Sequence, residues 1–370
     1  MLSSSENELI TRVAGDAPMG RMMRRYWLPT CLAEELPVPG GAAVTVRVLG
    51  EGLTVRRDAW GRVHAGAYPV REAGDLVWTY LGPPELEPPF PAFDFLCVPP
   101  EQRAIVKIGQ RTNYLQAIEG AIDSAHSWFL HRGTARDWAR RNEVSSDTAP
   151  QLEAEDTDYG FRYAAIRKPN ADPDGSRYVR VTNYVLPTTA LIPRPLDLDQ
   201  HTHVQIFVPV DDVNTMFYGL YVSQDGRAIS TAGMRERMGG RPGIELDERW
   251  FKRRGIANWF DQDRAAMKAG DWSGIVGIPQ QDMACQESMG PIVDRTLEHL
   301  GSSDIAIIRM RRRMLESVRR FIDGGAPIGL DTALPYGRIR SEQKIIPVEQ
   351  PWQSVGAYAG EYAPVAAVPT

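Results

Sequence analysis

The chain contains few cysteines and few histidines. Its 370 residues include three cysteines, Cys31, Cys97 and Cys285, and six histidines. No cysteine stands two or three positions before a histidine or another cysteine. This spacing excludes a disulfide framework and a thiolate metal cluster of recognisable pattern. We expect three buried, reduced thiols.

Long apolar runs and a strong excess of one charge are also missing. No stretch reaches the roughly 20 apolar residues that span a bilayer. The first residues, MLSSSENELITRV, have neither the basic nor the apolar segment of a secretory leader. The formal net charge of -5 argues against nucleic acid or an anionic membrane as partner. We therefore expect a cytoplasmic protein that binds neither nucleic acid nor a membrane.

Strand and helix patterns follow one another in blocks. Alternating apolar residues predict strands between 43 and 81, and a proline-rich linker follows over 83–100. Helical spacing covers 113–131, and four strands are predicted between 160 and 222. Helices are then expected over 248–269, 293–300 and 303–323.

This order favours an α+β fold in which helices cover an antiparallel sheet. We expect a small β-rich unit over residues 1–95, a second domain over 96–345 and an extended tail over 346–370. No internal repeat is visible, and 43% hydrophobic residues suffice for a sizeable core.

Two histidines of the predicted helix stand near a carboxylate. Asp123 and His126 are three positions apart and share a helix face. His126 and His131 are five apart, about 140° around a regular helix. Both can bind one ion only if the helix ends, bends or carries a wide turn between them. Two imidazoles and a carboxylate are typical of a non-haem Fe(II) centre, although zinc suits the same donors.

The carboxylate can come from elsewhere in the chain. Asp304 opens the predicted C-terminal helix and is the best candidate, although an acidic residue there is also a good helix start. Glu119 stacks on Asp123 as a like charge, which is unfavourable unless a positive group lies near. The pair His201 and His203 could form a second site, but such spacing on a strand is usually incidental.

Several blocks of sequence stand out, in this order: RRYWLP at 24–29, the helix at 113–131, YGFRYAAIR at 159–167, VPVDD at 208–212 and the segment 286–304. Together these blocks resemble the α subunits of the Rieske non-haem iron oxygenases. The resemblance is strongest to the phthalate 4,5-dioxygenase-like branch and covers nearly all of the chain. It implies a Rieske-type β domain followed by a helix-grip (START-like) catalytic domain with an antiparallel sheet.

The resemblance implies a role for four residues of the iron site. His126, His131 and Asp304 are similar to the two imidazole ligands and the carboxylate ligand of the mononuclear iron. Asp123 is similar to the bridging, catalytic aspartate, which hydrogen-bonds a ligand histidine and faces the cluster of a neighbouring subunit. The oxygenase interpretation depends on the convergence of these ligands on one ion.

The branch favours aromatic carboxylates, for which an arginine is the natural partner. Arg162 or Arg167, on the first strand after the helix, could bind such a carboxylate in a bidentate pair. The alternative is that one or both point to solvent.

The chain departs from the family at the iron–sulfur cluster. Family members hold a [2Fe–2S] cluster through Cys-x-His and Cys-x-x-His, and this sequence contains neither pair. Several dozen residues are missing between Val63 and Ala67, and His64 alone cannot hold a cluster. The first domain is therefore expected to be a truncated Rieske-type β domain.

The resemblance implies the oxygenase component of an aromatic-ring hydroxylating oxygenase. It would activate O2 at Fe(II) with electrons from NADH, delivered by a reductase, and hydroxylate an aromatic, possibly carboxylated, substrate. It would assemble as a trimer or hexamer, or with an intact homologous α subunit that supplies the cluster. The alternative is a non-catalytic helix-grip protein that binds small molecules or serves as a partner subunit. A third interpretation takes the missing segment as an artefact of gene prediction.

Overall fold

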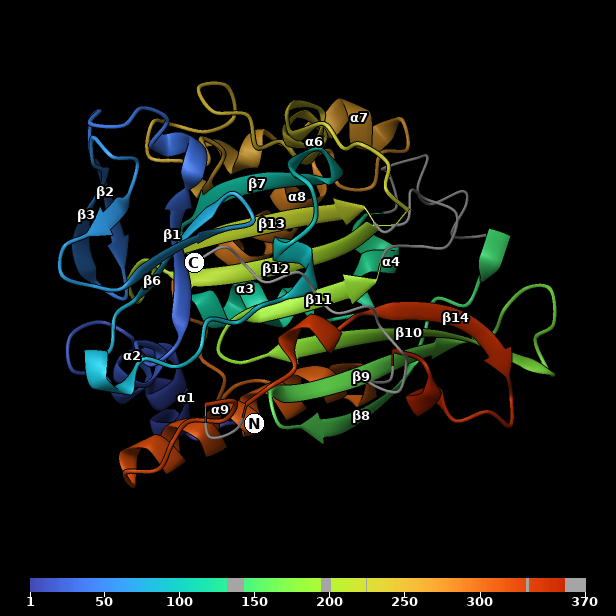
Figure 1. Ribbon diagram of the computed structural model, residues 1–370. Helices are drawn as coiled ribbons and strands as arrows, with labels where there is room; N and C mark the ends of the chain where they lie inside the picture. The colour runs from blue at the N-terminus through green and yellow to red at the C-terminus, as the bar shows by residue number, and fades with distance from the viewer. Residues whose placement is uncertain (132–142, 194–200, 224, 331–332, 357–370) are drawn as a thin grey trace.

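A large, curved antiparallel sheet forms the centre of the molecule (Figure 1). The computed structural model describes residues 1–131, 143–193, 201–223, 225–330 and 333–356. The strand order is β7-β13-β12-β11-β10-β9-β8, and β14 pairs with β10. The strands are β7 Arg103–Gln110, β8 Gln151–Thr157, β9 Gly160–Arg167, β10 Ser176–Val185, β11 Thr189–Pro193, β12 His201–Pro209, β13 Thr215–Ser223 and β14 Glu342–Pro347.

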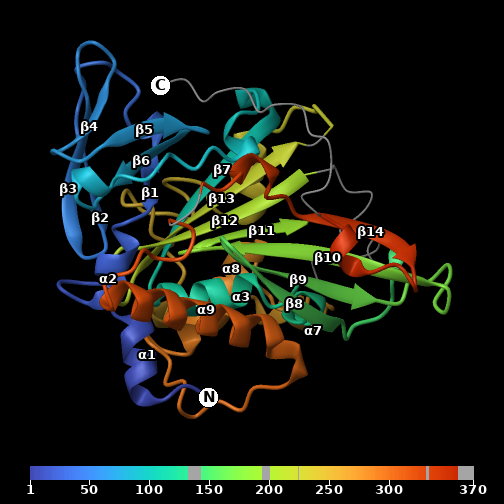
Figure 2. The same ribbon diagram turned by 60° about the horizontal axis from the view of Figure 1, so that its bottom comes forward.

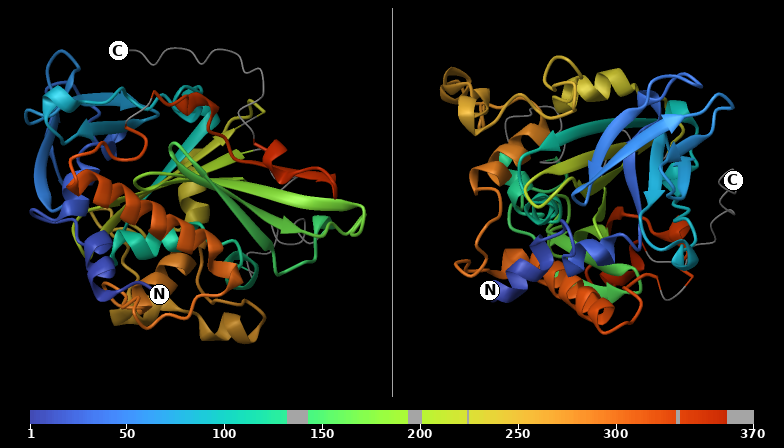
Figure 3. Two further views of the ribbon diagram at one scale, coloured as in Figure 1. Left: turned by 90° about the horizontal axis from the view of Figure 1, so that it is seen from below. Right: turned by 90° about the vertical axis from the view of Figure 1, so that its left-hand side faces the viewer.

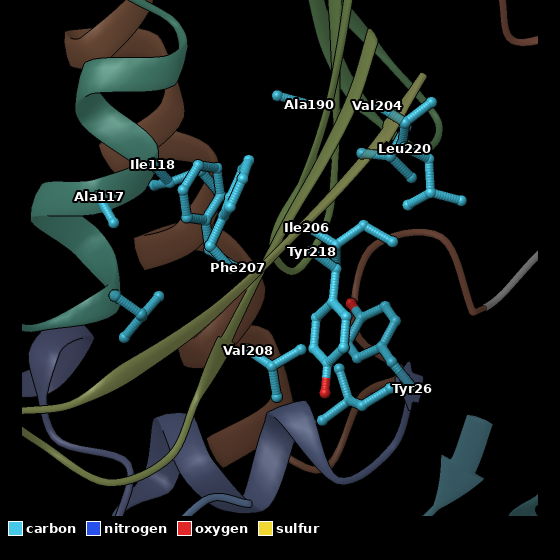
Figure 4. Packing of buried hydrophobic residues seen from close by; sticks show 14 of the residues in the cluster. Tyr26, Ala117, Ile118, Ala190, Val204, Ile206, Phe207, Val208, Tyr218 and Leu220 are labelled. Carbon is cyan, nitrogen blue, oxygen red and sulfur yellow. The ribbon is translucent and has the colours of Figure 1, made fainter. Parts of the chain in front are cut away.

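Helices cover one face of this sheet, and β14 lies toward the other (Figures 2 and 3). The helix α9 packs on the sheet through Ala306, Met310, Met314 and Val318, which recur every four residues and form one apolar stripe. In Figure 4, Ala117 and Ile118 of α3 lie beside Phe207 of β12. The α+β class is confirmed. The helices on this face are α3 Tyr114–Ala121, α4 His126–Leu130, α8 Ile278–Ser288 and α9 Ile305–Ile322.

The N-terminal β unit consists of two three-stranded sheets, with orders β1-β6-β5 and β2-β3-β4. It is joined to the large sheet by hydrogen bonds from Leu49 N to Pro209 O and from Gly50 N to Val210 O, both 2.8 Å. The two preceding helices, α1 and α2, contact α9 and so belong to the core of the second domain. The elements are α1 Ser4–Thr11, α2 Pro18–Met23, β1 Trp27–Leu32, β2 Val44–Val48, β3 Glu51–Arg57, β4 Val63–Ala65, β5 Val70–Ala73 and β6 Leu76–Tyr80.

A tight turn occupies the place where the cluster-binding segment is missing. Tyr68 N donates to Ala65 O at 3.2 Å, and Gly66 adopts a left-handed φ of 61° that favours glycine. β4 and β5 are therefore joined directly. His64 lies nearby, and its Nε2 is 2.8 Å from Asp58 Oδ2, so its partner is a carboxylate of the same hairpin.

Several predicted elements differ from the structure. No helix forms over 293–300, because Arg295 is drawn into the core and Asp294 accepts hydrogen bonds from Thr296. Residues 248–269 hold only short helical pieces. Strands β7, β8, β11 and β14 and helices α6 and α8 were not predicted.

The remaining short elements are α6 Thr231–Met238, α7 Arg264–Lys268, η1 Ala33–Glu35, η2 Pro84–Leu86, η3 Asp94–Leu96, η4 Pro100–Gln102, η5 Ile256–Asp261, η6 Ser302–Asp304, η7 Tyr336–Arg338 and η8 Trp352–Ser354.

The expected tail begins inside the fold. Ile346 belongs to β14, and Trp352 and Val355 are buried with it against the outer face of the sheet. Residues 357–370 lie outside the described part of the chain.

Among the described helices, none combines the length and apolar character that crossing a membrane requires. Cys31 is buried, Cys97 is half-buried and Cys285 is exposed, so the expectation of three buried thiols holds for Cys31 alone.

Candidate metal centre and its cavity

The predicted helix over 113–131 forms two pieces, and the second piece ends before His131, as the spacing of the two histidines requires. Asn113 caps α3 by accepting from Leu115 N at 3.1 Å, and α3 ends at Ala121. The break over residues 122–125 comes before His126. The second piece, α4, ends at Leu130 and leaves His131 at its C-cap. This geometry turns both imidazoles toward the same point.

Side chains on both sides of the break hold its shape. Asp123 Oδ1 accepts from Ala125 N at 2.8 Å, which forms an Asx turn within the break. Tyr163 of β9 donates to Ile122 O at 2.7 Å, and Arg167 donates to Ser124 O at 3.0 Å. The backbone carbonyls that the interrupted helix leaves free thus find partners on the sheet.

His126, His131 and Asp282 bring three donor atoms together. The two Nε2 atoms lie 3.3 Å apart, and Asp282 Oδ1 is 3.2 Å from His131 Nε2 and 3.5 Å from His126 Nε2. Two donors bound at right angles about 2.1 Å from one ion lie about 3.0 Å apart. The triangle therefore fits a single divalent ion. No other such group of His, Cys, Asp or Glu occurs among the residues that the structure describes.

The structure corrects the prediction for Asp304. Its carboxylate Oδ2 accepts from Gly301 N at 2.7 Å at the start of α9, so it serves the helix start and does not join the metal group. Asp282 of α8 supplies the carboxylate instead. The signal that could have found α8 is Pro279 just inside its start, followed by polar residues in a largely buried segment.

The carboxylates and histidines at the centre stabilise the charged forms of one another. Burial alone would lower the pKa of His126, but Asp123 and Asp282 outweigh it and raise that pKa to about 10. Burial would likewise raise the pKa of Asp282, and the two histidines lower it. Asp123 Oδ2 lies 3.5 Å from His126 Nδ1, on the side of the ring away from Asp282. The two carboxylates thus hold His126 between them.

A buried cluster of ions supplies the positive neighbour that Glu119 requires. Arg295 Nη2 lies 2.8 Å from Glu119 Oε2, and Arg311 Nε lies 2.7 Å from Glu119 Oε1. Burial would raise the pKa of Glu119, but the two arginines outweigh it and lower the pKa. The cluster joins α3 to α9, and so fixes the helix that leads to the metal ligands.

A cavity of about 160 Å³ opens beside the three donors. A cavity of similar size, about 150 Å³, accommodates benzene, so there is room for one aromatic ring. The wall formed by the sheet includes the polar side chains of Arg180, His203 and Gln205 and the hydroxyl-bearing Tyr163, Thr182 and Tyr221. His203 stacks on Tyr221 at 4.3 Å between ring centroids. The apolar part of the wall includes Ala117, Ile192, Phe207, Phe217, Met238, Ile278 and Met283.

The two arginines predicted to bind substrate lie on opposite faces of β9. Arg162 faces outward, where it pairs with Glu155 at 2.6 Å and stacks over Trp352, away from the cavity. Arg167 shares the inner face with Arg180, but Arg180 alone of these three lines the cavity. Burial lowers the pKa of Arg167 to about 10, and the neighbouring Arg180 adds to this effect.

Comparisons with known proteins agree on one family. A family model described as "LigXa C-terminal domain like" matches residues 79–369. The phthalate 4,5-dioxygenase oxygenase subunit of Pseudomonas putida is 37% identical, with 96% of this chain and 95% of the relative aligned. The 3-chlorobenzoate-3,4-dioxygenase oxygenase subunit of Comamonas testosteroni is 29% identical, with 96% and 98% aligned.

Solved structures share the fold at low identity. Dicamba monooxygenase bound to dicamba gives a TM-score of 0.55 at 14% identity, covering 82% of this chain and 99% of that chain. A variant oxygenase in complex with ferredoxin, from carbazole 1,9a-dioxygenase, gives 0.51 at 15% identity, covering 87% and 98%.

The alignment with the phthalate relative also contains gaps on the side of this chain. It runs over 429 positions, although this chain has 370 residues, so several dozen positions of the relative have no counterpart here. The chain belongs to the Rieske non-haem iron oxygenases, as an oxygenase (α) subunit of the phthalate dioxygenase branch, whose members hydroxylate aromatic compounds.

Proposed function

We propose that this chain uses Fe(II), held by His126, His131 and Asp282, to hydroxylate a one-ring aromatic carboxylate. The convergence of three donor atoms, 3.2 to 3.5 Å apart, beside a ring-sized cavity carries the proposal. When bound, such an iron supplies dioxygen activation at coordination positions that the protein leaves open. The family supports iron over zinc, which the donors alone would accept equally.

Arg180 is the proposed partner of the substrate carboxylate. It lines the cavity from β10, whereas Arg162 faces away and Arg167 is not part of the cavity wall. The relatives named for phthalate and for 3-chlorobenzoate suggest this class of substrate. An arginine binds a carboxylate through two parallel hydrogen bonds, which orients the ring as well as holding it.

Asp123 is the proposed link to the electron donor. It lies on the outer side of His126 and is partly exposed, with about a quarter of its side chain accessible. A carboxylate in this position holds the imidazole in one orientation and can hydrogen-bond to a group on a partner protein. Its role here is to position His126 and to offer a short path for electrons.

The electrons must come from outside this chain, because its sequence contains no cluster-ligand pair. We infer that an intact homologous α subunit supplies the cluster within a mixed trimer or hexamer, and that a reductase, using NADH, reduces it. The ferredoxin complex of the carbazole enzyme supports a small redox protein as a further partner class. Location in the cytoplasm stays a prediction.

The absence of cluster ligands also favours a second candidate. The chain could bind an aromatic ligand without turnover, or serve as a non-catalytic subunit. Its cavity and its arginine would be the same, so binding alone does not separate the two functions.

A complementation experiment separates them. The chain is loaded with Fe(II) without oxygen and given phthalate or 3-chlorobenzoate, reductase, NADH and an intact α subunit whose own mononuclear site has been disabled. We expect hydroxylated product in the mixture and none from either subunit alone. Hydrogen peroxide, which brings its own oxidising equivalents, should give some product without a partner.

The matched control is Asp282→Ala in the same mixture, which should remove the product. Ligand binding without product, both in the mixture and with peroxide, would overturn the enzyme proposal and leave the binding function.

A further inference from the structure

Gln281, the residue before the proposed carboxylate ligand, contacts the ring of the second histidine. It lies on α8 and is 2% exposed. Its Oε1 is 2.7 Å from His131 Nδ1, and its Nε2 donates to Ile275 O at 2.8 Å. Both the oxygen and the nitrogen of the Gln281 amide therefore have partners within the protein.

This pair of contacts determines which atom of the amide faces the histidine. The carbonyl of Ile275 can only accept, so the amide must present its NH2 group there. The oxygen is left for His131, and an oxygen can only accept. His131 Nδ1 must therefore carry the hydrogen of this bond, which leaves the lone pair of Nε2 directed at His126 and Asp282. That tautomer is the one that binds a metal through Nε2.

The two histidines are held by different groups. Asp123 lies 3.5 Å from His126 Nδ1, whereas His131 is bonded to a neutral, fully buried amide at 2.7 Å. The shorter contact is the tighter restraint on ring orientation. Gln281 also lies next to Asp282 on α8, so one helix supplies a ligand and orients another.

We propose that Gln281 is a positioning residue, which fixes the tautomer and the ring orientation of His131 for metal binding. The inference rests on the proposed metal site. The carbonyl of Ile275 accepts from Gln281 Nε2, and so keeps the amide oxygen and nitrogen from exchanging places. Groups of this kind change metal affinity by about 10- to 100-fold when they are removed.

The neighbouring Gln280 provides a matched control. It is also 2% exposed, and its Nε2 donates to Gly239 O at 2.7 Å. It contacts none of the three donors through a hydrogen bond. Gln280→Leu therefore removes a comparable buried amide from the same helix while leaving the histidine untouched.

The test uses Co(II) alone as the probe, because its visible absorption reports coordination geometry without turnover. We expect Gln281→Leu to weaken Co(II) binding about 10- to 100-fold and to shift its absorption bands. Gln281→Glu keeps an acceptor for His131 and should recover most of the affinity. Gln280→Leu should lower the melting temperature but leave the affinity within about threefold.

Two results would overturn the inference. One is an equal loss of affinity in Gln280→Leu and Gln281→Leu, which would show a structural effect only. The other is Gln281→Glu binding no better than Gln281→Leu. If the wild-type protein itself binds no Co(II), the metal site fails, and the inference fails with it. Wild-type binding with either of the first two results would overturn only the role of Gln281.

Discussion

The N-terminal β unit and the metal centre differ in how they are built. In the β unit, a segment between two neighbouring strands is absent, and a turn from Ala65 to Tyr68 closes the gap. In the metal centre, donors from residues 126 to 282 converge, and they come from α4, its C-cap and α8. A cofactor site built from surface loops can be removed without harming its framework, whereas one built by convergence depends on the whole domain.

Insertions should give the largest difference between the two regions. Adding Gly-Ser-Gly between Ser124 and Ala125 should abolish Co(II) binding, because it separates the histidines from the residues that orient the helix break. The same insertion between Gly66 and Ala67 should leave the affinity unchanged and reduce the free energy of unfolding by about 1 kcal/mol or less. Co(II) titration and thermal melting check both. Equal effects at the two positions would break the comparison.

Carboxylates in ion pairs should also contribute differently to the free energy of unfolding in the two regions. Glu119→Gln should reduce the free energy of unfolding by about 3–5 kcal/mol, because it removes the carboxylate that Arg295 and Arg311 share in the core and leaves Arg311 only its pair with Glu298. Glu72→Gln in the β unit, which disrupts an exposed pair with Arg57, should cost about 1 kcal/mol or less. Denaturant unfolding measures both.

The pH dependence of the Glu119 contribution has a definite sign. The pKa of Glu119 is lowered in the folded protein, despite its burial, by Arg295 and Arg311. Its contribution should be complete above the pKa of an unfolded glutamate, about 4.3, and should be lost as the pH falls through the lower folded value. The difference between wild type and Glu119→Gln should therefore shrink in acid, and a difference that grows there would contradict the ion cluster.

Substrate binding should depend on the inner face of the sheet. Arg180→Met should weaken binding of phthalate about 10- to 100-fold, through loss of a charge-assisted hydrogen-bonded pair. Arg162→Met should have no effect on binding, because Arg162 packs on the outer face against Trp352. Calorimetry on the metal-loaded protein measures both affinities, and a larger loss in Arg162→Met would place the substrate elsewhere.

The smallest effect is expected at the residue first predicted as the carboxylate ligand. Asp304→Ala should cost about 1 kcal/mol of stability, by loss of the bond at the start of α9. Its metal affinity should match that of wild type. A loss of metal in this variant would restore the original assignment.

The features that follow from local spacing could be predicted from the sequence. The helix end before His131 follows from two histidines five positions apart, and the need for positive charge near Glu119 follows from the like charge expected at Asp123. The closed gap in the β unit follows from the missing cysteine–histidine pairs. Each of these depends on residues close together in the chain or on a family pattern.

The features that depend on packing between distant segments could not be predicted from the sequence. Asp282 lies on a helix with a weak sequence pattern, and only the tertiary fold brings it to the histidines. Asp304 does not lie with the histidines, whereas Asp282 does, so the carboxylate expected beside them comes from a different residue than predicted. Alternation along a strand shows that Arg162 and Arg167 face opposite sides, but choosing Arg180 requires the register between β9 and β10.

Metal analysis of three proteins tests the central claim most directly. Wild type, Asp282→Ala and Asp304→Ala are reconstituted with Fe(II) without oxygen, desalted and analysed for iron and acid-labile sulfide. We predict about one iron per chain in wild type and Asp304→Ala, little iron in Asp282→Ala, and no sulfide in any of them. Full iron in Asp282→Ala, together with loss of iron in Asp304→Ala, would contradict the account.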